Sequence, residues 1–410
     1  MRRGAPRGVL AQAAARAEPA HFAVVMATGI LSAALRRAGF AAASGALLAL
    51  ALGAFLVLLA AVGGRAVHDR PGLLAGLSDP VRAPGWFCFV AACGVLGTGL
   101  MGVRPAALAL AALVLAGWLV LAGLIPARLA RAPRFRPGTV VNGSWYLGVV
   151  ATQSVALAVA SRPVAGLLGA PTAATAAGPV WAAGLLLYLV ITALLLARLH
   201  RAGAGPVGTR APYWVAMGAA SISVLAATRI IALPGDPGIR PAVTGLAIMA
   251  WALATLLIPV LATATVRDCW PRGWRPRYRA AAWTVLFPAG MYAMAGLELG
   301  RAARMPAIVQ VGAAVLWPVA AGWALTVAAM ATALRDALRR AGRAGPGYGP
   351  PAAGHTSSNE DSGRRSASRL PPGTAPAAYI VLRYKWSPAE PGFPVAPDAG
   401  KPGGQSGRAP

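Results

Sequence analysis

Long apolar runs without a single charge constrain this chain more than any other feature of its sequence. Such runs cover residues 47–62, 106–124 and 180–196. A helix rises about 1.5 Å per residue, so runs of this length span much of the roughly 30 Å hydrocarbon core of a bilayer. A soluble core would show shorter runs interrupted by polar residues. The runs therefore predict an all-α integral membrane protein.

The composition agrees with this prediction. The 410 residues are 57% hydrophobic and 12% charged, whereas a soluble domain carries about 25% charged residues. The formal net charge of +27 raises the alternative of nucleic-acid binding. The arginines lie between the apolar runs, however, and not in one basic region. We therefore expect the lipid bilayer as a partner and no nucleic acid.

The apolar runs predict about ten transmembrane helices within a transporter or channel domain at residues 21–338. We expect them near residues 21–38, 44–63, 85–103, 105–124, 142–160, 177–198, 212–232, 241–264, 281–299 and 307–334. Residues 343–410 are rich in Pro, Gly and Ser and cannot bury a core, which predicts a disordered cytoplasmic tail. The short apolar run at 378–386 (AYIVLRYKW) departs from this composition.

Arginines are unevenly divided between the loops, and this predicts the orientation of the chain. The two most basic loops follow the fourth and eighth helices and contain Arg128, Arg131, Arg134 and Arg136, and Arg267, Arg272, Arg275, Arg277 and Arg279. The segments before the first helix and after the tenth are also basic. Because cytoplasmic loops are enriched in Lys and Arg, we expect both termini, including residues 1–20, on the cytoplasmic side of the cytoplasmic (plasma) membrane.

The odd-numbered helices contain more small and polar residues than the even-numbered ones. The first reads HFAVVMATGILSAAL and the fifth NGSWYLGVVATQSVALA, whereas the second reads ALALGAFLVLLAAV. Helices that face a bundle interior or a water-filled path need such residues. The alternation predicts five parallel helical hairpins, with the odd helices around a central pore and the even helices outside. Close packing of helices would also explain the Gly and Ser residues.

Few residues offer catalytic or metal-binding chemistry. Of eleven acidic residues only Glu298 falls within a membrane run, and the four histidines and three cysteines lack metal-ligand spacing. We therefore expect no catalytic site, no metal and no cofactor. A path so poor in carboxylates favours anions, which need hydroxyl, amide and freed backbone N–H donors.

Candidate residues for an anion path lie mostly on the odd helices. The pore-lining candidates are Thr28, Gly29, Ser32, Gly94, Gly97, Thr98, Thr152, Gln153, Ser221 and Ser223. Arg229, Arg240 and Arg301 lie near the outer helix ends, where they would attract anions or extend to the membrane interface. Pro288 lacks an N–H group and is expected to disturb the ninth helix.

Several of these segments resemble a known family. HFAVVMATGILS resembles the first-helix signature of the tellurite-resistance/C4-dicarboxylate transporter family, which includes plant slow anion channels and yeast malate and sulfite permeases. SDPVRAPGWFCFVAACGVLG and NGSWYLGVVATQSVA are similar to its bacterial members. WTVLFPAGMYAMAGLE resembles the ninth helix of the slow anion channels, with Phe-Pro and a Glu eleven positions after the Phe. The resemblance covers about residues 18–335.

The resemblance implies a homotrimer in which each protomer has its own pore, lined by five inner helices and closed by a Phe. In this sequence that gate would be Phe287, followed by Pro288. A Phe that merely packs beside the kink is the alternative. The tail has no counterpart in the family, and the long regulated termini of the plant channels are missing.

Together these observations predict a channel or proton-coupled carrier for small anions. The candidate substrates are C4-dicarboxylates such as malate, chloride, nitrate, sulfite and tellurite-related oxyanions. A permease for a neutral solute or drug is one alternative. A membrane-embedded transferase for lipid-linked substrates is another, but it needs clustered acids or histidines at the membrane surface. A sensor that signals through the tail is the third.

Overall fold

The computed structural model describes residues 17–131, 140–202, 211–234, 238–269 and 278–343, and all regular structure in these ranges is helical. Five shorter helices, the inner helices, are α2 (Ala23–Arg37), α5 (Phe87–Gly99), α8 (Tyr146–Val159), α11 (Trp214–Ile231) and α13 (Trp283–Ala302). Five longer ones, the outer helices, are α3 (Ala41–His68), α6 (Arg104–Ala130), α10 (Ala170–Ala202), α12 (Ile239–Cys269) and α14 (Pro306–Arg343). The expected tail at 343–410 lies, apart from its first residue, outside the described residues.

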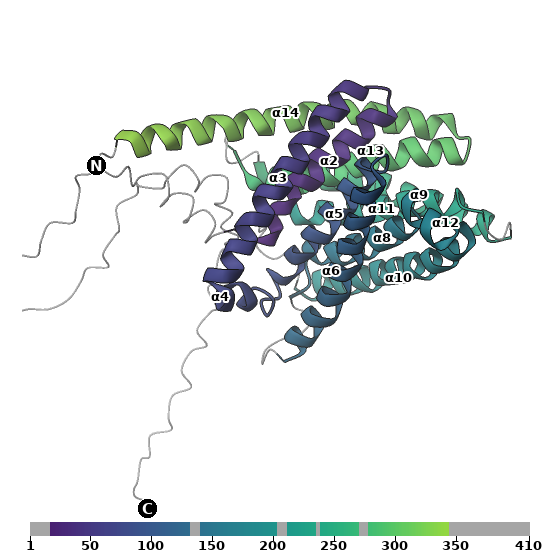
Figure 1. Cartoon of the computed structure of the whole chain (residues 1–410), viewed down its shortest axis with the longest axis horizontal. Helices are drawn as coiled ribbons and strands as arrows, with labels where there is room; N and C mark the ends of the chain where they lie inside the picture. Colours follow the sequence, from purple (N-terminus) through teal and green to yellow (C-terminus); the bar gives the residue numbers. More distant parts are fainter. Residues whose placement is uncertain (1–16, 132–139, 203–210, 235–237, 270–277, 344–410) are drawn as a thin grey trace, which may run out of the picture.

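The inner helices contact one another in a closed cycle. Helix α2 packs on α5, α5 on α8, α8 on α11, α11 on α13, and α13 again on α2. Each outer helix packs against one inner helix that is adjacent in the sequence, and it also contacts the next inner helix of the cycle (Figure 1). Among the described residues, each longer helix therefore contacts two neighbouring members of the cycle of shorter helices.

Burial follows the composition of the two sets of helices. In the most apolar stretch of the inner spans Pro19–Arg37 and Ala211–Ile231, 83% of the residues are buried. The corresponding share is 17% in the outer spans Ile239–Arg267 and Pro306–Asp336. Exposed leucines and valines on the outer helices are stable only where lipid replaces water. The inner helices are instead covered by protein, which explains their tolerance of Gly, Ser and Thr.

The helices long and apolar enough to cross a membrane number eight in the described residues, or nine if a bent pair is one span. That pair is Gly143–Val159 and Arg162–Leu168 (α9), which meet at 58°. The third expected span, 85–103, is the shorter apolar helix Ala83–Gly99. It ends at Gly99, so this third predicted helix is present but is too short to be counted as a span.

One aromatic residue recurs on every outer helix at its contact with the next inner helix. Phe55 of α3 stacks on Phe89 of α5, with ring centroids 6.1 Å apart. The indole Nε1 of Trp118 on α6 donates to Thr152 Oγ1 on α8 at 2.9 Å. Trp181 of α10 donates to the Ser223 carbonyl of α11, and Trp323 of α14 donates to Thr28 Oγ1 of α2. Trp251 of α12 stacks on the Tyr292 ring of α13. Trp323 thus joins the last outer helix to the first inner helix.

Candidate functional site

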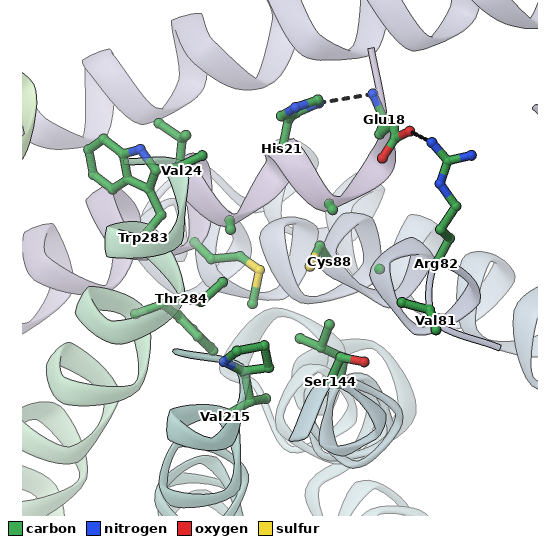
Figure 2. Close-up of a pocket in the computed structure, with 18 of the residues that line it drawn as sticks. Glu18, His21, Val24, Val81, Arg82, Cys88, Ser144, Val215, Trp283 and Thr284 are labelled. Carbon is green, nitrogen blue, oxygen red and sulfur yellow. Dashed lines mark hydrogen bonds and ion pairs between the residues drawn. The ribbon is translucent and has the colours of Figure 1, made fainter. Parts of the chain in front are cut away.

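A cavity of about 80 Å³ lies where the N-terminal ends of all five inner helices meet (Figure 2). We call it the N-terminal cavity. Each inner helix is preceded by a short 3₁₀ turn, and these turns are η1 (Pro19–Phe22), η2 (Ala83–Trp86), η3 (Gly143–Trp145), η4 (Ala211–Tyr213) and η6 (Ala280–Ala282). Residues of all five turns line the cavity. The five inner helices therefore start at the same end of the bundle and run in parallel.

Apolar side chains make up much of the lining of this cavity. Each inner helix contributes at least one of them near its start, and these include Met26, Cys88, Leu147, Val215 and Phe287. Phe287 is the largest of these five and is only 2% exposed. Pro288 packs against α11, where a Cβ on Gly218 would lie 3.1 Å from the proline. Because there is no side chain at Gly218, α13 approaches α11 closely at the residue after Phe287.

The rim of the N-terminal cavity is more polar. Glu18 forms an ion pair with Arg82, and its backbone N–H donates to Nδ1 of His21 at 2.9 Å (Figure 2). Tyr278 accepts a hydrogen bond from Trp283 Nε1 at 3.2 Å. Burial raises the pKa of the Tyr278 phenol, and the hydrogen bond from Trp283 opposes this shift. The phenol therefore stays neutral at physiological pH and keeps its own proton to donate.

Four of the predicted pore-lining side chains bond toward the outer helices. Trp323 and Trp118 donate to the hydroxyl oxygens of Thr28 and Thr152. Ser32 Oγ donates to the Ser44 carbonyl of α3 at 2.7 Å, and Gln153 Nε2 donates to the Trp181 carbonyl of α10 at 3.1 Å. These contacts connect the two layers of helices.

The other candidates on the inner helices have different surroundings. Ser221 and Ser223 donate to carbonyls of their own helix, at 2.8 Å each. Gly29 and Gly94 lie at close helix contacts, because an added Cβ would meet Val95 at 2.6 Å and Ser154 at 3.1 Å. Gly97 and Thr98 line a second cavity.

This second cavity, the C-terminal cavity, has a volume of about 20 Å³ and lies near the C-terminal ends of α5 and α8. Arg229 of α11 reaches it. The three arginines that were predicted to attract anions have different partners. Arg229 is 3.8 Å from Glu298, and Arg301 donates to the Arg37 carbonyl at 3.0 Å. Arg240 instead donates to the Leu233 carbonyl at 3.1 Å.

Among the residues that line the N-terminal cavity, the sequence interpretation named Phe287 but missed Met26, Cys88, Leu147 and Val215, and it also missed the partner of Glu298. Met26, Leu147 and Val215 are ordinary apolar residues in apolar helices, and only their shared place near the start of each odd helix distinguishes them. Arg37 is the last residue of α2 and pairs with Glu298 at 2.8 Å. Among the described residues, no three His, Cys, Asp or Glu side chains are placed to hold a metal ion.

The buried helix cycle, the lipid-exposed outer layer and the cavities at its two ends define a multi-pass membrane protein. Residues 16–331 match the family model of the voltage-dependent anion channels, and the chain belongs to this family. The match confirms the resemblance to the tellurite-resistance/C4-dicarboxylate transporter family that the helix motifs indicated. Its members are anion channels and transporters and not enzymes, so the transferase alternative is excluded.

Two curated relatives also match. They are uncharacterized membrane proteins from the CDC 1551 and H37Rv strains of Mycobacterium tuberculosis, each 34% identical over 166 residues. The match covers 40% of this chain and 84% of each relative. These relatives support placement in a membrane.

Proposed function

We propose that this protein passes small anions across the cytoplasmic membrane along a path enclosed by its five inner helices, and that Phe287 closes this path. The observation that supports the proposal most is the N-terminal cavity, which all five inner helices line and in which Phe287 is almost fully buried. A constriction of apolar side chains blocks ions by excluding water, without any charge.

The parallel direction of the inner helices favours anions at this entrance. Each helix N-terminus carries roughly half a positive charge and unpaired N–H groups. Five such ends meet at the N-terminal cavity, so an anion that enters it meets a positive potential. A neutral solute gains nothing from this potential, which argues against the neutral-solute permease.

Finer features of the function follow from the same proposal. We propose C4-dicarboxylates such as malate, or inorganic anions including tellurite-related oxyanions, as substrates of a channel or a proton-coupled carrier. We also propose a homotrimer with both termini in the cytoplasm, which places the N-terminal cavity on the cytoplasmic side. The alternation of arginine-rich loops supports this orientation. The predicted pore-lining residues and Arg229, Arg240 and Arg301 remain candidates for the path.

The test is anion flux through purified protein in liposomes, with chloride, nitrate, sulfite and malate as substrates. Phe287→Ala should raise the flux per assembled protein, because a methyl group replaces a ring that lines the N-terminal cavity. Phe89→Ala is the matched control, since Phe89 is also on an inner helix but packs between Phe22 and Phe55 outside the cavity. Both truncations remove a packed ring, at a cost of about 3–5 kcal/mol where the ring is fully buried.

Assembled protein is counted by size-exclusion chromatography before reconstitution, so a loss of folding is not mistaken for a loss of transport. The gate assignment is wrong if Phe287→Ala transports no faster than the parent, or if Phe89→Ala accelerates transport equally. A reversal potential that follows the cation gradient would refute anion selectivity itself.

A further inference from the structure

Arg229 has an unused set of hydrogen-bond donors. Its side chain is 20% exposed, and its guanidinium group makes no hydrogen bond to the described residues. The nearest carboxylate oxygen, Glu298 Oε1, lies 3.8 Å from Nη2, beyond hydrogen-bond distance. A guanidinium group has five N–H donors. The donors of Arg229 are therefore available to an acceptor that enters the adjacent cavity.

Glu298 does not supply that acceptor because Arg37 already holds it. Arg37 Nε lies 2.8 Å from Oε1 and Nη2 lies 3.0 Å from Oε2, which is a two-point pair with the carboxylate. The Glu298 side chain is only 11% exposed. The carboxylate is thus fixed on the α2 side and remains near Arg229 as a charge without bonding to it.

The C-terminal cavity lies against Arg229. Of the described residues that line it, Arg229 alone is charged, and Thr98 and Ser161 contribute hydroxyl groups. Thr98 has already given its proton to the Gly94 carbonyl at 3.0 Å. Ser161 precedes α9, and its hydroxyl makes no hydrogen bond to another described residue, so its proton can be donated. Arg229 and Ser161 together therefore offer donors to one small acceptor.

The charges around the cavity add to this preference. Arg37, Arg229 and Arg301 lie in the last turns of α2, α11 and α13, where cations offset the negative helix C-termini. Arg162 adds another positive charge that interacts with Arg229. One carboxylate, Glu298, opposes these arginines. A cavity of about 20 Å³ has room for one species the size of a water molecule or a halide ion.

We infer that the C-terminal cavity is a binding site for a halide-sized monovalent anion, coordinated by Arg229 and Ser161 and weakened by the neighbouring charge of Glu298. The inference deepens the proposed function, since an anion held here stands at the end of the inner helices opposite Phe287. It assigns the site to small inorganic anions.

The experiment measures thermal unfolding of the purified full-length protein in detergent against chloride concentration, with gluconate replacing chloride at constant ionic strength. Chloride should raise the unfolding midpoint saturably, as expected for a ligand of the folded state, whereas gluconate is too large to enter. Arg229→Gln should abolish the saturable response. Glu298→Gln should lower the apparent Kd roughly tenfold, because one repelling charge a few ångströms away is removed. Arg201→Gln, at an exposed arginine in the last turn of α10 that does not line the cavity, should match the parent.

Two hydroxyl variants test the coordination itself. Ser161→Ala should raise the apparent Kd several-fold, while Thr98→Val should leave it unchanged because the Thr98 proton is already used. The stronger affinity of Glu298→Gln cannot result from misfolding. Arg229→Gln combined with Glu298→Gln keeps the test valid if the single arginine variant does not fold, and it should not bind chloride.

The inference is overturned if chloride and gluconate act alike on the parent, if Arg229→Gln responds like the parent, or if Glu298→Gln binds no tighter. Binding is measured at equilibrium and without transport. If Phe287→Ala does not raise the flux but chloride still binds, only the gate is rejected. If Phe287→Ala raises the flux but chloride does not bind, only this site is rejected.

Discussion

Replacing Gly312 with alanine tests how closely the last outer helix packs on its inner partner. Gly312 is buried in α14, and a Cβ there would lie 2.9 Å from the Ala293 carbonyl oxygen and 2.9 Å from the Leu297 backbone nitrogen of α13. Ordinary contacts of a Cβ begin at 3.4 Å. Both obstacles are backbone atoms, so no side-chain rotation relieves the clash and α14 must move outward. Overpacking of this kind costs about 1–3 kcal/mol.

Gly53→Ala is the matched control for this substitution. Gly53 is an exposed residue of the outer helix α3, and an added Cβ would meet nothing within 4 Å. The control should gain about 0.5–1 kcal/mol, because alanine loses less backbone freedom than glycine when a helix forms. Gly312→Ala shares this gain, so the two variants should differ by the overpacking cost alone, about 1–3 kcal/mol in the free energy of unfolding.

Reversible unfolding in mixed micelles, followed by circular dichroism over an SDS titration, measures that difference. If Gly312→Ala is as stable as Gly53→Ala, the close approach of α13 and α14 is wrong. A loss of stability in both variants would show that glycine is needed in these helices for some reason other than the contact.

Three further predictions concern the ends of the chain and the aromatic contacts. A reporter fused after residue 335 should be cytoplasmic, and an external signal there would refute the orientation that the arginine-rich loops predict. Deletion of residues 346–410 should leave insertion, oligomeric state and transport unchanged, which chromatography and liposome flux would check; loss of folding would mean that residues 378–386 bind to the membrane domain. Trp323→Phe and Thr28→Val should each cost about 1 kcal/mol for the lost hydrogen bond, and a double-mutant cycle should give a coupling energy near that value; additive effects would disprove the contact.

The alternation of inner and outer helices was predictable because it depends on composition alone. A helix such as α3 that faces lipid needs only apolar residues, and a helix such as α2 that is covered by protein tolerates Gly, Ser and Thr. The helix ends were less predictable. The expected span 44–63 is Ala41–His68 in the structure. The helix continues past Arg65 to His68, and the Arg65 guanidinium group donates to the Ala17 carbonyl at 2.9 Å.

The sequence could not predict in which direction the polar side chains of the inner helices point. A hydroxyl in an apolar helix is satisfied equally well by the carbonyl four residues earlier, by a neighbouring helix or by a water-filled path. Ser221 bonds to its own helix, Ser32 to α3, and Thr28 to Trp323. The sequence shows that such residues exist in the odd helices but not which partner each one has, because the partners come from segments far away along the chain.

Parallel packing of the inner helices gives the bundle an electrical asymmetry that its charged residues reduce. Five N-termini make the end near Phe287 favourable to anions, and five C-termini make the opposite end unfavourable, with roughly half a negative charge each. Arg37, Arg229 and Arg301 lie at that second end, and Glu298 takes up part of their charge. Without these arginines, an anion drawn into the path would face a barrier where it must leave. The same arginines that let the helix ends pack together therefore also make the proposed path continuous for an anion.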